Sequence, residues 1–350
     1  MAGSLAKVFS LEKGRSVTWE QRWHPLLERW VTITSHRGGR PWQGLSATAN
    51  DDHRPSFDPQ CYLCPGNRRI SGERNPQYAQ VYVFDNDHPS LGATVAPPPP
   101  QSTFYRVAPA AGRCRVMCYD PDHQRRLSHL EINELEIVLK SWRHETEMLS
   151  DEGWAHVFIF ENNGEVVGVS NPHPHCQIYA FPFVVDTIAR ELRAAKTYRE
   201  AHQRPLFQDL IQAERDDQRR ILIDNEGWLA FVPYFAQFPF ETMICPHRPV
   251  RQLTELSDLD IQDLAVVMRA VLGRLDGVLG QAQSYILSVH QAPAALIDPE
   301  DYSLYIHIQP LLRAPGLQKF LAGVETAAGQ FLNDAAPEAH AQALMEVPLN

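Results

Sequence analysis

The feature that most constrains the fold of this chain is a repeat in the order of its predicted elements. Strand, loop, helix, strand, turn and strand follow one another twice. The first series starts at the strand 115–119 and has its helix at 130–142, and the second starts at the strand 241–245 and has its helix at 258–275. Four apolar residues recur 126 positions later (253 − 127 = 126): Met117 and Met243, Leu127 and Leu253, Leu130 and Leu256, Leu135 and Ile261. A shared order at one spacing predicts a duplication.

The strands that complete the two series are predicted at 157–160, 285–289 and 304–308. Strands joined in this order favour antiparallel meanders with the helices packed on one face, which is an α+β fold. A helix predicted near 188–204 has no counterpart in the second series. We therefore expect two halves, an N-terminal half over residues 1–195 and a C-terminal half over residues 196–350.

The composition is that of an ordinary globular protein, with 44% hydrophobic and 21% charged residues. A net charge of −10 argues against nucleic acid or an anionic membrane as the main partner. No stretch approaches the roughly 18 consecutive apolar residues of a transmembrane helix, and residues 1–30 lack the apolar core of a signal peptide. Of the six cysteines, two form a close pair and four are scattered, so we expect a cytoplasmic chain without a disulfide framework.

Two histidines alternate with prolines in the run Ser170-Asn171-Pro172-His173-Pro174-His175-Cys176-Gln177. The prolines fix φ and favour extended neighbours, so His173 and His175 point the same way. A neutral imidazole can attack phosphorus and become a covalent carrier, which makes His175 a candidate nucleophile. Gln177, on the same face, is placed to donate to a phosphoryl oxygen, and Ser170 is a further donor. The alternative is a packed surface loop with two buried histidines.

Cys61 and Cys64 form a Cys-x-x-Cys pair, which can share one tetrahedral Zn²⁺. Structural zinc needs two more ligands, for which His123 and His173 are the candidates. The alternatives are a redox pair or two inert thiols. A redox pair normally begins a helix, and Pro65-Gly66 directly after Cys64 argues against that.

Two further groups of polar residues have chemistry suited to ligands. Arginine forks match phosphate, and Asn or Asp side chains hold sugar hydroxyls. The candidates of this kind are Arg37, Arg40, Asn86, Asp87, Asn162 and Lys319. The carboxylate of Glu191 with the imidazoles of His290 and His307 suits iron or zinc. The alternatives are solvated surface residues for the first group and hydrogen-bonded core histidines for the second.

Taken together, these motifs resemble the galactose-1-phosphate uridylyltransferase family of the histidine-triad superfamily, over about residues 30–330. The segments that carry the resemblance are Ser35-His36-Arg37-Gly38-Gly39-Arg40-Pro41-Trp42-Gln43-Gly44, Cys61-Tyr62-Leu63-Cys64-Pro65-Gly66-Asn67, Tyr82-Val83-Phe84-Asp85-Asn86-Asp87, Asp120-Pro121-Asp122-His123, Ser170-Asn171-Pro172-His173-Pro174-His175, Pro239-Phe240-Glu241-Thr242 and Pro310-Leu311-Leu312-Arg313 before Lys319-Phe320.

The resemblance implies two fused histidine-triad halves, a homodimer whose active sites use both subunits, and a ping-pong reaction. His175 would take the uridylyl group from UDP-glucose, releasing glucose 1-phosphate, and pass it to galactose 1-phosphate to give UDP-galactose, while Gln177 holds the phosphoryl oxygens. By position the resemblance assigns Cys61, Cys64, His123 and His173 to structural zinc, and Glu191, His290 and His307 to a second site for iron or zinc. It assigns uridine and phosphate contacts to Asn86, Asp87 and Asn162, and phosphate and hexose contacts to Arg37, Arg40, Lys319, Phe320 and Glu325, some of them from the partner subunit.

Three departures from the family pattern bear on the site. Cys176 stands where the family usually has Gly, which places a thiol beside the predicted nucleophile. Tyr305 replaces one imidazole of a His-x-His pair, and a phenol with a pKa of about 10 is a poor ligand for a divalent cation. We expect the second metal site to be weak, altered or empty. Val324 replaces an aromatic residue before the hexose-binding Glu325, which bears on hexose selectivity.

Two other functions stay open on the sequence. One is a nucleoside-diphosphate-sugar phosphorylase or hydrolase that uses the same histidine with another nucleoside. The other is a zinc-stabilised nucleotide-binding protein without catalysis, against which the intact His175 and Gln177 argue.

Overall fold

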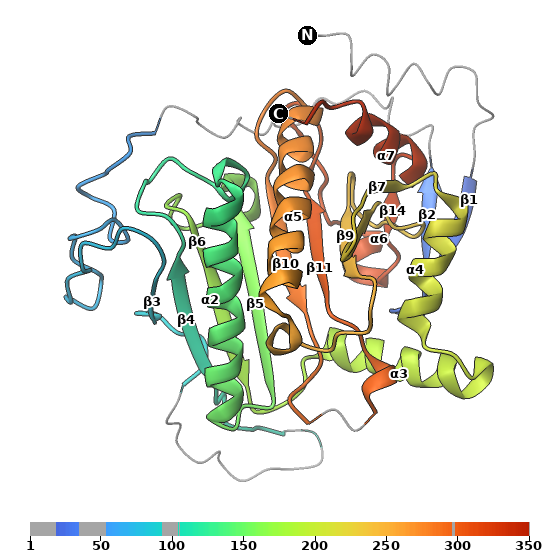
Figure 1. Cartoon of the computed structure of the whole chain (residues 1–350), viewed down its shortest axis with the longest axis horizontal. Coiled ribbons are helices and arrows are strands. Elements are labelled where there is room, and N and C mark those ends of the chain that lie inside the picture. The colour runs from blue at the N-terminus through green and yellow to red at the C-terminus, as the bar shows by residue number, and fades with distance from the viewer. Residues whose placement is uncertain (1–18, 35–53, 93–103, 105, 296–297, 350) are drawn as a thin grey trace.

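The computed structural model describes residues 19–34, 54–92, 104, 106–295 and 298–349 (Figure 1). Arg37 and Arg40, predicted to contact phosphate, lie outside the described residues. Within the described part of the chain, no helix has both the length and the apolar character needed to cross a membrane.

One antiparallel sheet of nine strands runs through both halves of the chain. Its strands, in spatial order, are β3 (Tyr82–Asp85), β4 (Arg113–Cys118), β6 (His175–Phe181), β5 (His156–Asn163), β10 (Tyr285–His290), β11 (Tyr305–Pro310), β9 (Thr242–Pro246), β8 (Trp228–Phe231) and β7 (Ile221–Asp224). The halves meet where β5 pairs with β10. The predicted α+β fold is confirmed. The predicted boundary at residue 195 falls inside α3 (Asp186–His202) and stays a prediction.

Two long helices, α2 (Ile132–Asp151) and α5 (Asp258–Val278), lie side by side over one face of the sheet (Figure 1). Each follows a short 3-10 turn, Leu127–His129 or Leu253–Glu255, at the predicted spacing of 126 residues. Both helices begin with a capping box, in which the side chain before the helix and the third helical side chain exchange hydrogen bonds with backbone N–H groups. Their apolar sides share one core with the sheet.

The spacing of 126 residues does not extend to the strands. Met117 lies in the core under the helices, whereas Met243 packs on the opposite face of the sheet. The predicted match of Met117 with Met243 is therefore wrong, because equivalent residues of two repeated strands face the same side of the sheet.

The opposite face of the sheet carries a second, smaller core under α3 and α4 (Leu206–Asp217). The remaining elements lie mostly at the ends of the chain: β1 (Trp19–His24), β2 (Arg29–Thr34), β12 (Leu312–Ala314), β13 (Leu317–Gln318), α6 (Val324–Ala328), β14 (Leu332–Asn333) and α7 (Pro337–Met345). β14 pairs with β2, so the described N-terminal and C-terminal segments lie together.

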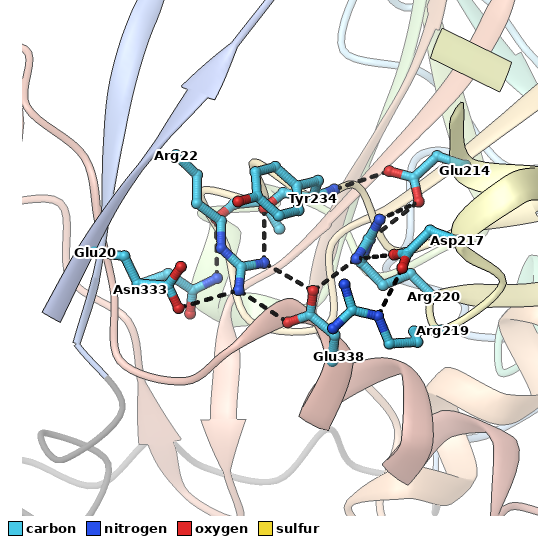
Figure 2. Close-up of polar contacts among 10 residues, drawn as sticks. Glu20, Arg22, Glu214, Asp217, Arg219, Arg220, Tyr234, Asn333 and Glu338 are labelled. Atoms are coloured by element: carbon cyan, nitrogen blue, oxygen red, sulfur yellow. Dashed lines mark hydrogen bonds and ion pairs between the residues drawn. The ribbon is translucent and has the colours of Figure 1, made fainter. Parts of the chain in front are cut away.

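A buried ionic network fastens these two ends to the rest of the fold (Figure 2). Glu338 of α7 accepts from Arg22 of β1 at 3.0 Å and from Arg220 at 2.6 Å. Arg220 also pairs with Glu214 of α4 at 2.8 Å. The ring of Tyr234 lies 4.2 Å from the Arg22 guanidinium and 5.1 Å from that of Arg220. Each buried charge therefore has an opposite charge beside it, as burial requires.

His340 of α7 makes folding stability depend on pH. Its ring packs against Phe240 with centroids 4.5 Å apart, and burial lowers the pKa of His340 to about 4. Because the unfolded chain binds this proton near pH 6.5, the free energy of unfolding falls as the pH drops from 6.5 towards 4. Between pH 7 and pH 5, the free energy of unfolding measured with urea should fall by about 2 kcal/mol more in the wild type than in His340→Leu. Equal losses in the two proteins would contradict this prediction.

Candidate active site

His175 is the first residue of β6, and its imidazole is held by its own segment. Its Nδ1 lies 2.7 Å from the carbonyl oxygen of His173. Since a carbonyl can only accept, Nδ1 carries the proton, and the lone pair of the neutral ring is on Nε2. Burial lowers the pKa of His175, which favours this neutral form. The ring is therefore an oriented nucleophile with one free nitrogen.

Cys176 and Gln177 lie on opposite faces of β6. Cys176 is fully buried in the core under the helices, where its Sγ accepts the indole N–H of Trp142 at 3.3 Å. The expectation of a thiol beside the nucleophile is therefore wrong, because side chains alternate along a strand and only His175 and Gln177 share a face. Burial raises the pKa of Cys176, so the thiol stays protonated. A side chain is tolerated there because φ is not in the left-handed region.

Two cavities meet at His175. One, of about 190 Å³, is lined by Gln177, Ser170, Asn86 and Asp87, with an apolar wall that includes Tyr62, Leu63, Phe84 and Val116. The Asn86 side chain accepts the His88 N–H at 2.8 Å, and Asp87 accepts the Ser71 N–H at 3.2 Å, so backbone groups orient both side chains. This cavity therefore combines an apolar wall with polar side chains, and His175 is part of its lining.

The other cavity, of about 130 Å³, is lined by the histidine segment from Asn171 to His175 and by several polar side chains. Asn162 lines it together with Arg125, Arg126 and Glu161. Glu161 is fully buried, accepts the hydroxyl of Tyr119 at 2.6 Å, and has its pKa raised to about 7 by burial. The structure thus brings four predicted ligand contacts, Asn86, Asp87, Asn162 and Ser170, to the two sides of His175.

Three predicted hexose contacts lie elsewhere in the subunit. Lys319 and Glu325 pair at 2.6 Å, with Phe320 next to Lys319 in the segment between β13 and α6. Among the described residues, neither cavity lined by His175 includes any of the three.

Cys61, Cys64, His123 and His173 come together as the sequence predicts. All four are buried, and their ligand atoms lie within 4.8 Å of one another. Cys64 Sγ is 3.5 Å from the Nδ1 atoms of His123 and His173, which are 3.4 Å apart. Hydrogen bonds from Cys64, and from His123 and His173, lower the pKa of Cys61, so the group holds a thiolate. Within the described parts of the chain, no other set of three or more such residues is close enough to share a cation.

Two neighbours orient these four side chains, and the sequence analysis did not connect either with the metal. Tyr78 donates to the carbonyl of Leu63 at 2.7 Å, and its oxygen lies 2.7 Å from His173 Nε2. With His173 Nδ1 facing the cation, Nε2 carries the proton and donates to Tyr78. The Asn171 amide contacts Cys61 Sγ at 3.4 Å and accepts the His173 backbone N–H at 2.9 Å. For Tyr78 no local signal exists, because an aromatic residue in a turn-rich segment is not specific.

The predicted second metal set comes together only in part. Glu191 and His290 are 3.3 Å apart, and both also contact Tyr305. His307 turns to Glu241, with Nε2 3.0 Å from Oε1. Glu241 was quoted as part of a motif, but its pairing with His307 is visible only in three dimensions.

The Tyr78 hydroxyl should support metal binding without contacting the metal. Tyr78→Phe keeps the ring but removes the partner of His173 Nε2, and losses of about 10- to 100-fold in metal affinity are usual for such changes. Competition with a coloured chelator measures the affinity, and Tyr82→Phe, whose ring stacks on Tyr78 at 5.3 Å, is the control. An unchanged affinity in Tyr78→Phe would contradict the assignment.

Comparison with known proteins supports a family assignment. The model of the galactose-1-phosphate uridyl transferase N-terminal domain matches residues 11–185, and that of the C-terminal domain matches residues 191–350. A galactose-1-phosphate uridylyltransferase of Haemophilus influenzae is 40% identical over 87% of this chain and 88% of its own. That of Rattus norvegicus is 36% identical over 93% of this chain and 87% of its own.

Solved structures agree with this relationship. A uridylyltransferase structure superposes with a TM-score of 0.76 at 29% identity, covering 93% of this chain and 97% of its own. An ADP-glucose phosphorylase from Arabidopsis thaliana, solved with bound ADP-glucose, has the same fold, with a TM-score of 0.76 at 21% identity over 95% of this chain and all of its own. Fold and family make the chain a nucleotidyltransferase. The chain belongs to the galactose-1-phosphate uridylyltransferase family, which confirms the resemblance and the prediction of an enzyme.

Proposed function

We propose that the enzyme transfers a uridylyl group from UDP-glucose to galactose 1-phosphate through a covalent intermediate on His175. The observation that carries the proposal is the imidazole itself. Its Nδ1 is fixed to the His173 carbonyl at 2.7 Å, which leaves the Nε2 lone pair available on a ring that lines both cavities. The relatives' names supply galactose 1-phosphate and the uridylyl group, and the family resemblance supplies UDP-glucose as the donor. The site adds a nucleophile suited to phosphorus.

Both half-reactions are displacements at the same phosphorus atom. His175 Nε2 attacks the α-phosphorus of UDP-glucose, and the bond to the bridging oxygen breaks, so that glucose 1-phosphate leaves with the electron pair. A phosphate oxygen of galactose 1-phosphate then attacks, and the phosphorus–nitrogen bond electrons return to Nε2. Gln177 is placed to donate its amide N–H to the phosphoryl oxygens, where charge builds up. Asn86 and Asp87 suit ribose hydroxyls, and the apolar wall suits the uracil ring.

The metal belongs to this machinery through His173. Two thiols and two imidazoles are the usual donors of tetrahedral zinc, so we infer Zn²⁺ at Cys61, Cys64, His123 and His173. When bound, the ion supplies structural rigidity rather than chemistry. The imidazole of His173 then faces the ion while its carbonyl oxygen holds His175. The cation thereby fixes the residue that orients the nucleophile.

Labelling of His175 tests the reaction directly. Wild-type enzyme incubated with UDP-glucose labelled at the α-phosphate should retain about one acid-labile label per chain, since one histidine is the carrier. His175→Ala should retain none and lose transfer activity, and Cys176→Ala is the matched neighbour that should still take up label. Peptide mapping locates the label.

The release of the label decides between the related reactions. Galactose 1-phosphate should release it as UDP-galactose. Release by inorganic phosphate or water alone would instead establish the phosphorylase or hydrolase. Label retained by His175→Ala, or absent from the wild type, would overturn the covalent mechanism and favour a binding protein.

We also propose that the enzyme works as a homodimer with shared active sites. Lys319, Phe320 and Glu325 line neither cavity at His175 of their own subunit in the described structure. The family resemblance nevertheless assigns them to the hexose phosphate. The cavity linings and the family assignment agree if these residues contact the hexose phosphate in the active site of the partner subunit. The exposed tryptophans Trp23 and Trp30, whose rings meet at 5.2 Å, add apolar surface near the same ends of the chain.

Mixing two inactive variants tests the shared site. His175→Ala and Lys319→Ala are each expected to be inactive alone. After refolding or subunit exchange, half of the dimers are mixed and contain one intact site, so about a quarter of wild-type activity should return. If Lys319 serves its own subunit, both sites of a mixed dimer are defective and no activity returns. Sedimentation confirms that the variants still dimerise.

A further inference from the structure

The second metal site implied by the family can be tested against the residues present. The resemblance assigns the cation to Glu191, His290 and His307, with Tyr305 in the place of a further imidazole. Ligands to one cation must point their lone pairs at a common centre. The question is whether the oxygens and nitrogens of this group are available to do so.

Glu191 already has partners on both carboxylate oxygens. It is buried on α3, 1% exposed. The Tyr305 hydroxyl donates to Oε1 at 2.7 Å, and the Tyr302 hydroxyl donates to Oε2. His290 Nδ1 lies 3.3 Å from Oε1. Two phenols and an imidazole thus surround a buried carboxylate, and hydrogen bonds to an ionised group are the strong kind.

The imidazoles are engaged as well. His290 Nδ1 lies 2.7 Å from the Tyr305 oxygen, and its Nε2 lies 3.1 Å from the Ser288 hydroxyl. One consistent arrangement has Ser288 donating to Nε2, Nδ1–H donating to Tyr305, and Tyr305 donating to Glu191. Every group then has a partner, and the imidazole is neutral.

The rings around this group are engaged in the same way. The rings of His290 and Tyr305 are stacked, with centroids 4.4 Å apart and planes at 28°, and their polar tips meet in the 2.7 Å hydrogen bond. The ring of His307 lies edge-on to that of His290, with centroids 5.5 Å apart. Its Nε2 is nevertheless occupied by Glu241, whose other oxygen accepts the N–H groups of Gln237 and Phe238.

We propose that Glu191, His290, Tyr302 and Tyr305 form a metal-free hydrogen-bonded group, called here the lock. In it the Tyr305 hydroxyl connects Glu191 with His290, as a cation bound between them otherwise would. The lock connects α3, which follows the catalytic strand β6, to β10 and β11 of the other half. The neutral donors around the buried Glu191 carboxylate would thereby hold the two halves together. The residues present do not fit a second cation, so the described part of the chain offers one cation site, at Cys61, Cys64, His123 and His173.

Metal content distinguishes the lock from a metal site. The full-length enzyme, dialysed in metal-free buffer, should contain one equivalent of metal per chain by mass spectrometry. Incubation with excess Zn²⁺ or Fe²⁺ followed by gel filtration should add none. Glu191→Gln should keep the single equivalent, and Cys64→Ser should lose it. A second equivalent in the wild type that Glu191→Gln abolishes would overturn the proposal.

Thermal unfolding tests the hydrogen bonds themselves. Tyr305→Phe and Glu191→Gln should each lower the Tm without changing the metal content. The loss of Tm in the double variant should be smaller than the sum of the two single losses by more than about 2 °C, because the second change removes a contact that is already broken. Tyr198→Phe is the matched control, because Tyr198 lies on α3 with Glu191 and its hydroxyl donates to Asp209 of α4 at 2.8 Å. Its loss of Tm should simply add to that of Glu191→Gln. Additive losses for Tyr305→Phe and Glu191→Gln would overturn the lock.

Discussion

The site depends on His173, because both its ring and its backbone carbonyl group make contacts that position other residues. Its ring lies among the side chains of Cys61, Cys64 and His123, 3.5 Å from Cys64 Sγ. Its carbonyl oxygen accepts a hydrogen bond from Nδ1–H of His175. The prolines on either side limit the backbone to extended geometry. A rigid connection therefore runs from a buried cluster to the reactive nitrogen. Without it, the His175 ring could adopt either tautomer and several rotamers.

The two halves carry different chemistry on strands of one sheet. His175 and Gln177 share a face of β6 in the N-terminal half, and Tyr305 and His307 share a face of β11 in the C-terminal half. One half keeps a free imidazole beside cavities. The other buries a phenol against Glu191. The same sheet therefore presents a nucleophile at one place and a structural contact at the other.

Much of this could be predicted from local patterns. The helices lie where the apolar spacing placed them, with α5 starting at Asp258 as expected and α2 extending to Asp151, beyond the expected end at residue 142. The four metal-cluster residues also come together. The strand match of Met117 with Met243 failed, because a spacing taken from helices does not carry through loops that differ in length. The β1 strand, in a segment without a clear signal, is stabilised by pairing with β2 and by ionic contacts to α7.

The sequence by itself determined the chemistry of the catalytic run and of the cysteine pair, because these depend on residues a few positions apart and on backbone limits set by proline. Only the tertiary structure decided what surrounds them. It turned the Cys176 thiol into the core against Trp142, placed Tyr78 on His173, and gave Glu191 two phenols instead of an open coordination site. These outcomes depend on contacts between residues up to 114 positions apart along the chain. Which face a strand turns to the core, and which distant hydroxyl reaches a buried carboxylate, is settled by packing of the whole sheet and helices.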